Sequence, residues 1–238
     1  RVGILSLNSD RYYQAVFAIP WAGCCMVPLN TRWALPENNY AVTDSGERVL
    51  LFDDAFAEQA QQLLQDVESL EVAIYMGDDA CPDWASSFTD MLAAHAPIAL
   101  PELDSNGMAG IFYTGGTTGF PKGVMQSHRA IWASAVGALP FMGMHRKSVY
   151  LHAAPMFHMA DFAGSMGSTM SCASNVIVRA FEPGLVLDTL GSEGVSHALL
   201  VPAMIKMIFN HPSLDAADVS QLERIMYGAS PMPAATLE

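Results

Sequence analysis

The chain has 238 residues, of which 51% are apolar and 15% are charged, a composition that can supply a large buried core. Its 11 basic and 24 acidic residues give a formal net charge of −13, which argues against nucleic acid as a partner because a phosphate backbone would be repelled. The longest uncharged stretches, residues 16–29 and 130–144, contain Gly and Pro and are shorter than the roughly 20 apolar residues of a membrane helix, so no transmembrane segment is predicted.

The four cysteines have no CxxC spacing, and no charged-then-apolar signal opens the chain. Both features are typical of a protein in the reducing cytoplasm, which is the compartment we expect. The sequence begins at Arg1, directly before an apolar run, and stops abruptly at Glu238. We therefore expect an interior piece of a longer protein, truncated at both ends.

Apolar runs of strand length alternate along the chain with segments of helical period, and Gly, Asn or Pro stands at the joins. This alternation indicates an α/β fold with a mainly parallel sheet and flanking helices. In chain order, strands are predicted at residues 2–7, 24–29, 48–53, 71–76, 108–113, 149–153, 176–179, 197–201 and 222–227. Helices are predicted at residues 10–22, 35–46, 55–67, 127–142, 161–172, 185–190 and 203–209, with a loop-rich stretch around 81–84. We expect one continuous α/β unit over residues 1–238, which two packed subdomains could form.

The most informative segment is Tyr113-Thr-Gly-Gly-Thr-Thr-Gly-Phe-Pro-Lys-Gly123, directly after a predicted strand. Its glycines permit close approach and positive φ, so the backbone N–H groups of this turn can converge on an anion. The threonine hydroxyls add donors, and the lysine, presented by the preceding Pro121, adds positive charge. The segment therefore predicts a polyphosphate-binding loop made of Thr114, Gly115, Gly116, Thr117, Thr118, Gly119 and Lys122.

Several familiar motifs do not fit. A Walker loop requires Gly before its Lys, where this chain has Pro121, and the G-x-G-x-x-G spacing is absent from the segment. No G-x-S-x-G is present to supply a serine nucleophile. The histidines and cysteines lack the spacing of metal ligands, so no metal-ligating residue is predicted. A flexible Gly/Thr surface loop with an incidental lysine is the alternative for such a turn taken alone.

The segment resembles the phosphate-binding signature of the acyl-adenylate-forming superfamily, which includes acyl-CoA synthetases and peptide-synthetase adenylation domains. The usual pattern is Tyr/Phe-Thr-Ser/Thr-Gly-Ser/Thr-Thr-Gly-x-Pro-Lys-Gly, and the single departure is Gly115, where the family has a hydroxyl. This departure predicts weaker nucleotide binding and no change in the fold. Residues 21–32, 35–37 and 44–46 resemble the family's early helix, Val-Pro-Leu strand and Pro-Glu helix, and residues 123–129 resemble the start of the helix after the loop.

The resemblance covers most of the chain and implies a partial N-terminal AMP-binding domain, residues 1–238, of an acyl-CoA synthetase-like fold. The family's mobile C-terminal domain, which carries a catalytic lysine, is absent from this sequence. We therefore expect the chain alone to be inactive.

A second segment, Ala154-Pro-Met-Phe-His-Met-Ala-Asp-Phe162, is similar to the family's Pro-x-Phe-His segment. In the family this histidine lies beside the carboxylate and the adenylate phosphate, which implies a catalytic and substrate-binding role for His158. Phe162 stands where long-chain members often place an aromatic gate, which implies a substrate-binding role. A capped or core histidine and a core phenylalanine are the alternatives. Asp161 occupies a place where many relatives have a small residue.

A third segment, Tyr227-Gly-Ala-Ser-Pro-Met-Pro233, resembles the strand-end turn that packs against adenine in the family. The resemblance implies nucleotide contacts at Gly228, Ala229, Ser230 and Pro231. The turn follows a predicted strand, and ligands of open α/β sheets bind at the carboxyl ends of strands. An ordinary Gly/Pro turn is the alternative.

The resemblance also implies a reaction. AMP is transferred from ATP to a carboxylate, pyrophosphate leaves, and the thiol of CoA takes the acyl group as a thioester. Lys122 and the loop N–H groups would offset the charge on pyrophosphate, Mg²⁺ would share that charge, and His158 would hold the carboxylate in line. The expected cofactors are therefore ATP, Mg²⁺ and CoA as co-substrate.

The substrate class follows less directly. The 15 methionines, and the phenylalanines near the motifs, favour a medium- or long-chain fatty acid. An aryl- or amino-acid-adenylating enzyme and a non-catalytic nucleotide-binding module stay open as alternatives. The resemblance allows a homodimer.

Overall fold

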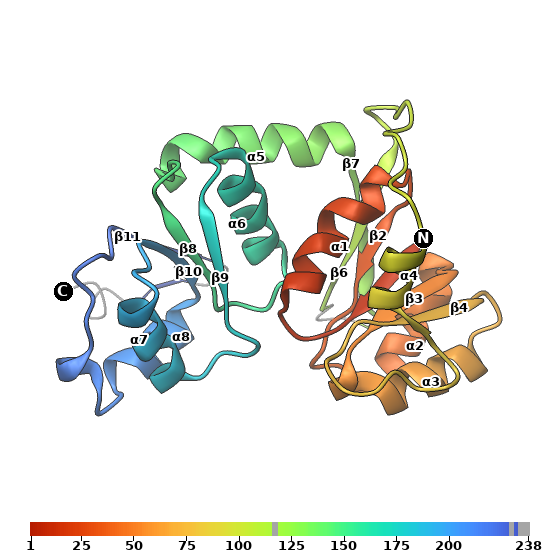
Figure 1. The fold of residues 1–238 in the computed structure, drawn as a ribbon, viewed down its shortest axis with the longest axis horizontal. Helices are drawn as coiled ribbons and strands as arrows, with labels where there is room; N and C mark the ends of the chain where they lie inside the picture. Colours follow the sequence, from red (N-terminus) through yellow and green to blue (C-terminus); the bar gives the residue numbers. More distant parts are fainter. Residues whose placement is uncertain (116–118, 229–230, 233–238) are drawn as a thin grey trace. The chain divides into compact units, whose positions relative to one another are not determined.

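The computed structural model describes residues 1–115, 119–228 and 231–232. The chain forms an α/β fold in two compact units, Arg1–Trp132 (unit 1) and Ala133–Glu238 (unit 2), and the dividing point lies within helix α5 (His128–Met142) (Figure 1). The predicted fold class, with mainly parallel sheets and flanking helices, is confirmed. Across the described ranges, no helix has the length and apolar character needed to cross a membrane.

Unit 1 is built on a sheet in which seven described strands follow the order β5-β4-β3-β1-β2-β6-β7. Their bounds are β1 (Val2–Leu5), β2 (Met26–Pro28), β3 (Val49–Phe52), β4 (Val72–Tyr75), β5 (Ser86–Ser87), β6 (Met108–Thr114) and β7 (Lys122–Ser127). Neighbouring strands run parallel, except that β6 and β7 pair antiparallel. The carboxyl ends of β1 to β6 therefore lie at one edge of the sheet.

The helices of unit 1 cover both faces of this sheet. They are α1 (Asp10–Trp21), α2 (Leu35–Ser45), α3 (Ala57–Asp66) and α4 (Phe88–Ala94), with a short 3₁₀ helix at Asp54–Phe56. Alternate residues of a strand point to opposite faces. Leu50 and Phe52 of β3 belong to the core that α2 and α3 cover, whereas Val49 and Leu51 face α1 and α4.

Local signals in the sequence explain where two of these helices begin and end. Ser9 caps α1, because its side chain accepts a hydrogen bond from the Tyr12 N–H. Gly46 ends α2 with φ +66, a left-handed conformation that glycine adopts without steric cost. Both ends agree with the sequence prediction.

Unit 2 is built on a second, all-parallel sheet, whose described strands follow the order β11-β10-β8-β9. Its elements are β8 (Val149–His152), α6 (Met159–Met170), β9 (Ser174–Ile177), α7 (Pro183–Ser192), β10 (His197–Leu200), α8 (Pro202–Phe209), a 3₁₀ helix at Leu214–Ala216 and β11 (Arg224–Tyr227). Leu151 of β8 packs in the core with α7 and α8, while Tyr150 and His152 point to the other face, toward α6.

Two segments differ from the prediction. Residues 123–127, which the resemblance assigns to the start of a helix, belong instead to β7, because they pair with β6 from Met108↔Ser127 to Thr114↔Lys122 and complete the edge of the sheet. The helix predicted from residue 127 begins at His128. In addition, the loop-rich stretch is followed by β5 and α4, which are not among the predicted elements. With 2 and 7 residues, they are too short to show a clear periodic pattern in the sequence.

Glu47, between α2 and β3, is a fully buried carboxyl group. Its Oε1 accepts a hydrogen bond from Ser45 Oγ at 3.1 Å, and its Oε2 has no hydrogen-bond partner among the described residues. Burial raises the pKa of Glu47 to about 8, although the Ser45 hydrogen bond opposes this. A Cβ at Gly3 would lie 1.8 Å from Oε2, so glycine leaves the room for this side chain.

We predict that Glu47→Gln removes a pH dependence of folding stability. The folded protein keeps a proton on Glu47 that the unfolded chain releases above its ordinary pKa of 4.5, so stability is lost as the pH rises from there to about 8. The slope is at most about 1.4 kcal/mol per pH unit. Urea unfolding across this range should show a flatter profile for the variant than for the wild type. Two parallel profiles would contradict the assignment.

Candidate functional site

The predicted phosphate loop is the connection between β6 and β7 in unit 1. Thr114 and Lys122 face each other in register, and the Thr114 hydroxyl donates to the Lys122 carbonyl at 3.4 Å. This hydrogen bond closes the neck of the loop. Three of the predicted phosphate ligands lie outside the described residues: Gly116, Thr117 and Thr118.

The described parts of the loop have room for a ligand near Gly115 and an exposed positive charge at Lys122. No described atom lies within 4 Å of the position that a Cβ on Gly115 would take. Gly119 has φ +137, a conformation that residues with a Cβ rarely adopt. Lys122 is exposed and forms no ion pair with any residue that the structure describes, so its ammonium group can approach an anion.

Helix α2 contacts both ends of this loop. At one end, the Tyr113 hydroxyl donates to Asp44 Oδ2 at 2.6 Å, and at the other, Phe120 stacks on Tyr40 with ring centroids 4.6 Å apart. Burial and the Asp44 hydrogen bond raise the pKa of Tyr113, so its phenol stays protonated as a donor. Tyr40 and Asp44 lie on one helix face, since they are four residues apart. The i, i+4 spacing predicts that they share a face but not that this face meets the loop, which depends on the tertiary packing of α2.

In unit 2, His158 stands at the N-cap of α6, with an exposed side chain. Its main chain is fixed on both sides, because its N–H donates to the Pro155 carbonyl at 3.0 Å and its carbonyl accepts from the Phe162 N–H at 3.1 Å. Its ring packs on Phe157 with centroids 4.1 Å apart. Phe162 is only 5% exposed, a position typical of a core residue, and its role as a gate stays a prediction.

The turn after β11 is the third predicted segment. Gly228 and Pro231 are described, whereas Ala229 and Ser230 lie outside the described residues. Because β8 and β11 both pair parallel with β10, the chain leaves β8 toward His158 and leaves β11 toward Gly228 at the same edge of the sheet. Two strand spacings, about 10 Å, separate these exits. The fold thus brings the His158 connection and the turn to one edge of unit 2.

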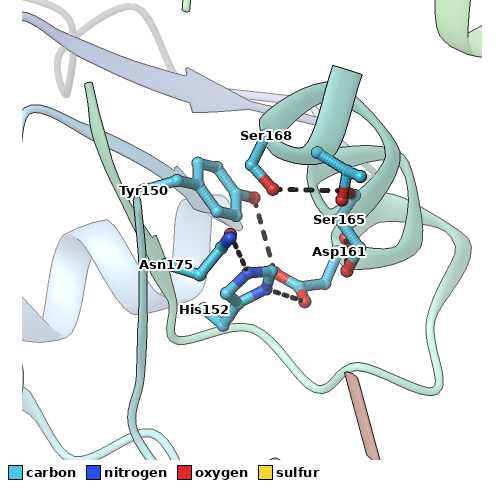
Figure 2. Close-up of polar contacts among 7 residues, drawn as sticks. Tyr150, His152, Asp161, Ser165, Ser168 and Asn175 are labelled. Carbon is cyan, nitrogen blue, oxygen red and sulfur yellow. Dashed lines mark hydrogen bonds and ion pairs between the residues drawn. The ribbon is translucent and has the colours of Figure 1, made fainter. Parts of the chain in front are cut away.

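Beneath the His158 connection lies a buried polar cluster (Figure 2). His152 Nδ1 lies 2.7 Å from Asp161 Oδ2, and His152 Nε2 lies 2.9 Å from Asn175 Oδ1. The Tyr150 hydroxyl donates to Asp161 Oδ1 at 3.4 Å. This cluster is not among the predicted sites, because the spacing of the histidines was weighed only against that of metal ligands. A signal was present, since His152 lies two residues after Tyr150 and therefore points to the same face of an otherwise apolar strand.

Comparisons with known proteins place these segments in context. The model of a family described as AMP-binding enzyme matches residues 1–238. The chain is 33% identical to a feruloyl-CoA synthase of Amycolatopsis sp, over 98% of this chain and 45% of the relative. It is 28% identical to the fatty acid–[acyl-carrier-protein] ligase ScoC of Streptomyces coeruleorubidus, over 100% of this chain and 45% of the relative.

Among solved structures, the N-terminal domain of FACL13 from Mycobacterium tuberculosis, with an inhibitor bound, matches with a TM-score of 0.85 at 25% identity. The match covers 99% of this chain and 58% of that one. The chain spans about half the length of the curated relatives it matches.

We predict that two alanine substitutions in the phosphate loop have different effects. Gly119→Ala should lower the free energy of unfolding by about 1 kcal/mol or more, because its φ of +137 is unfavourable for a residue with a Cβ. Gly115→Ala is the matched control, since its Cβ meets open space and its φ lies outside the left-handed region. It should be neutral or stabilise by up to about 1 kcal/mol. Chemical denaturation distinguishes the two, and equal losses would show that the backbone at Gly119 does not constrain the loop.

Proposed function

Since this chain belongs to the family of AMP-binding enzymes, we propose that the protein containing it activates a carboxylic acid with ATP and passes the acyl group to the thiol of CoA. One observation carries this proposal. The strands on either side of the loop, β6 and β7, pair antiparallel up to Thr114↔Lys122, which puts the exposed Lys122 at the neck of the loop, at the carboxyl edge of the unit 1 sheet. Such a neck would suit a triphosphate, because no described neighbour crowds the Cβ position of Gly115 and Lys122 supplies the opposite charge.

The chemistry requires activation because the oxygen of a carboxylate is a poor leaving group. A carboxylate oxygen attacks the α-phosphorus of ATP, the bond to the β-phosphate oxygen breaks, and pyrophosphate leaves. The thiolate of CoA then attacks the acyl carbon, and AMP leaves with the electron pair of the mixed anhydride. The first step moves negative charge onto pyrophosphate, and the second moves it onto AMP.

Three groups of residues have roles in the first step. The loop N–H groups and Lys122 would stabilise the charge that develops on pyrophosphate. The exposed ring of His158 would orient the carboxylate in line with the α-phosphate. The turn at Gly228 and Pro231, with Ala229 and Ser230, would contact the adenine.

Mg²⁺ is implied by the family and would enter with the phosphates of ATP, whose charge it shares. In the part of the chain that the structure describes, no group of three or more His, Cys, Asp or Glu side chains could hold a metal ion. No described residue is therefore assigned to Mg²⁺.

For the acid, we propose a fatty acid of medium or long chain. Two features support this choice: the 15 methionines, which suit an adaptable apolar pocket, and the name of the relative ScoC, a fatty acid ligase. A cytoplasmic location and a homodimer belong to the same proposal, and the absence of CxxC spacing supports the reducing compartment.

The direct test is carboxylate-dependent exchange of pyrophosphate into ATP, measured with the full-length protein that contains this chain. Fatty, aryl and amino acids are offered separately at equal concentration. We expect exchange with medium- or long-chain fatty acids. Exchange with aryl acids alone would overturn the substrate class, and no exchange with any acid would overturn the ligase function.

We predict that Lys122→Ala lowers kcat/KM for ATP in this assay by about 10-fold to 100-fold. The reason is that a charge-assisted hydrogen bond to a phosphate contributes about 1.5–3 kcal/mol. Lys147→Ala is the matched control, because Lys147 is also exposed but precedes β8, at the amino edge of the unit 2 sheet. The control should change kcat/KM less than about twofold. An equal effect of both variants would remove Lys122 from the site.

We predict that Gly115→Ser strengthens nucleotide binding. The substitution restores the hydroxyl that the family pattern has at this position, and open space receives it. One added hydrogen bond of about 0.5–1.5 kcal/mol corresponds to a Kd for ATP that is about 2-fold to 10-fold lower. Calorimetric titration of ATP measures this change, with Gly115→Ala as a control that adds a methyl group but no donor. Equal affinities of the serine and alanine variants would show that position 115 does not reach the phosphates.

A further inference from the structure

We propose that His152, Asp161 and Asn175 form a clamp that sets the conformation of the connection from β8 to α6 and so positions His158. The inference rests on the role proposed above for His158. Under it, these three residues are positioning residues, since they act through His158 and do not touch the substrate.

The clamp joins the two ends of the connection (Figure 2). His152 is the last residue of β8, and Asp161 lies in the first turn of α6, three residues after His158. Their side chains meet at 2.7 Å, and both have an exposed fraction of 0%. Because residues 153–160 run between these two points, the pair fixes where the connection starts and where the helix begins.

The hydrogen bonds indicate that His152 is an imidazolium ion. Both of its ring nitrogens face acceptor oxygens, Oδ2 of Asp161 and Oδ1 of Asn175, whereas a neutral imidazole has a single N–H. The Asn175 amide donates its Nδ2–H to the Ala173 carbonyl at 3.5 Å, which turns Oδ1 toward the ring. Burial lowers the pKa of His152, but the Asp161 carboxylate and the two hydrogen bonds outweigh it and raise the pKa above its usual value.

A second buried histidine of unit 2 provides a contrast. The ring of His197 lies 2.8 Å from Ser196 Oγ, and burial lowers the pKa of His197. Burial alone therefore favours a neutral histidine in this unit. The charge on His152 comes from its carboxylate partner.

The packing around the clamp leaves little freedom for α6 to move. A Cβ on Gly164 would lie 2.0 Å from the Tyr150 hydroxyl, so only glycine allows the helix to approach the strand this closely. At this distance the same hydroxyl can donate to Asp161. The Ser165 hydroxyl donates to the Asp161 carbonyl at 3.2 Å within the helix.

A buried ion pair is a weak source of stability, because desolvation of the two charges offsets most of their attraction. An apolar pair of similar volume would stabilise the sheet face equally well. What the clamp supplies is direction, because the charged ring of His152 forms one hydrogen bond to Asp161 and a second to Asn175, and the two together favour one geometry. The clamp is therefore suited to hold the His158 connection in one conformation.

A double-mutant cycle in the full-length protein tests this inference. Asp161→Asn keeps the size of the side chain and removes its charge, and we expect it to lower kcat of pyrophosphate exchange at least 10-fold while KM for ATP changes less than 2-fold. His158→Ala should also lower kcat. Because Asp161 acts through His158, adding Asp161→Asn to His158→Ala should lower kcat no further than 2-fold. Additive losses would overturn the clamp.

A matched control separates positioning from stability. Val186 is buried in α7, on the opposite face of the same sheet, and Val186→Ala should lower the unfolding temperature while kcat stays within 2-fold at temperatures where the variant is folded. A loss of kcat equal to that of Asp161→Asn would overturn the proposal. If Asp161→Asn does not fold, Asn175→Ala, which leaves the ion pair in place, enters the same cycle.

The cycle also distinguishes the two proposals. If the wild type exchanges pyrophosphate but the losses from Asp161→Asn and His158→Ala add up, the clamp alone is overturned. Absence of exchange with every acid would overturn the proposed function, and the clamp with it. As a readout besides activity, ¹⁵N NMR should show His152 with both ring nitrogens protonated at neutral pH, and a single N–H would contradict the clamp.

Discussion

Parallel strand pairing is the constraint on which the arrangement of candidate residues depends. A parallel strand requires a crossover, so every connection of this kind leaves the sheet at its carboxyl edge. In unit 1 this edge receives the end of β6 and the loop that leads to Lys122. In unit 2 it receives the exit from β8 toward His158 and the exit from β11 toward Gly228. Residues far apart in the sequence thus share an edge before any side-chain contact is considered.

Each unit then uses one helix to fix a connection at that edge. In unit 1, α2 holds the loop from outside, through a hydrogen bond from Tyr113 to Asp44 and a ring contact between Phe120 and Tyr40. In unit 2, α6 holds the connection from within, through a buried ion pair. The difference follows from accessibility. Exposed rings can stack in contact with water, whereas a buried carboxylate requires a cation and further donors. Both solutions leave the residue proposed to meet the ligand, Lys122 or His158, exposed.

The sequence predicts much of this fold because most elements are defined by local signals. Apolar runs locate the parallel strands, and Ser9 and Gly46 mark helix ends that the structure confirms. β7 was missed because residues 122–127 become a strand only through pairing with β6, and three of them are exposed, so no apolar run identifies them. The pairing of His152 with Asp161 was missed for a related reason. Their contact depends on how closely α6 approaches β8. Gly164 permits this close approach, but a glycine within a predicted helix does not by itself indicate it.

The charge of the chain sets a further condition on an anion site. With a net charge of −13, the protein repels a polyphosphate on average, so each acid whose charge is offset or removed by its surroundings favours an anion site. Asp44 and Glu47 are two such acids. Asp44 accepts a hydrogen bond from Tyr113, so the positive end of the O–H dipole points at its carboxylate and offsets part of its charge. Glu47 is fully buried, and since burial raises its pKa to about 8, it is mostly protonated at neutral pH. Burial of a carboxyl group without a cation thus lowers the negative charge of unit 1, because the proton that Glu47 keeps at neutral pH removes one of its charges.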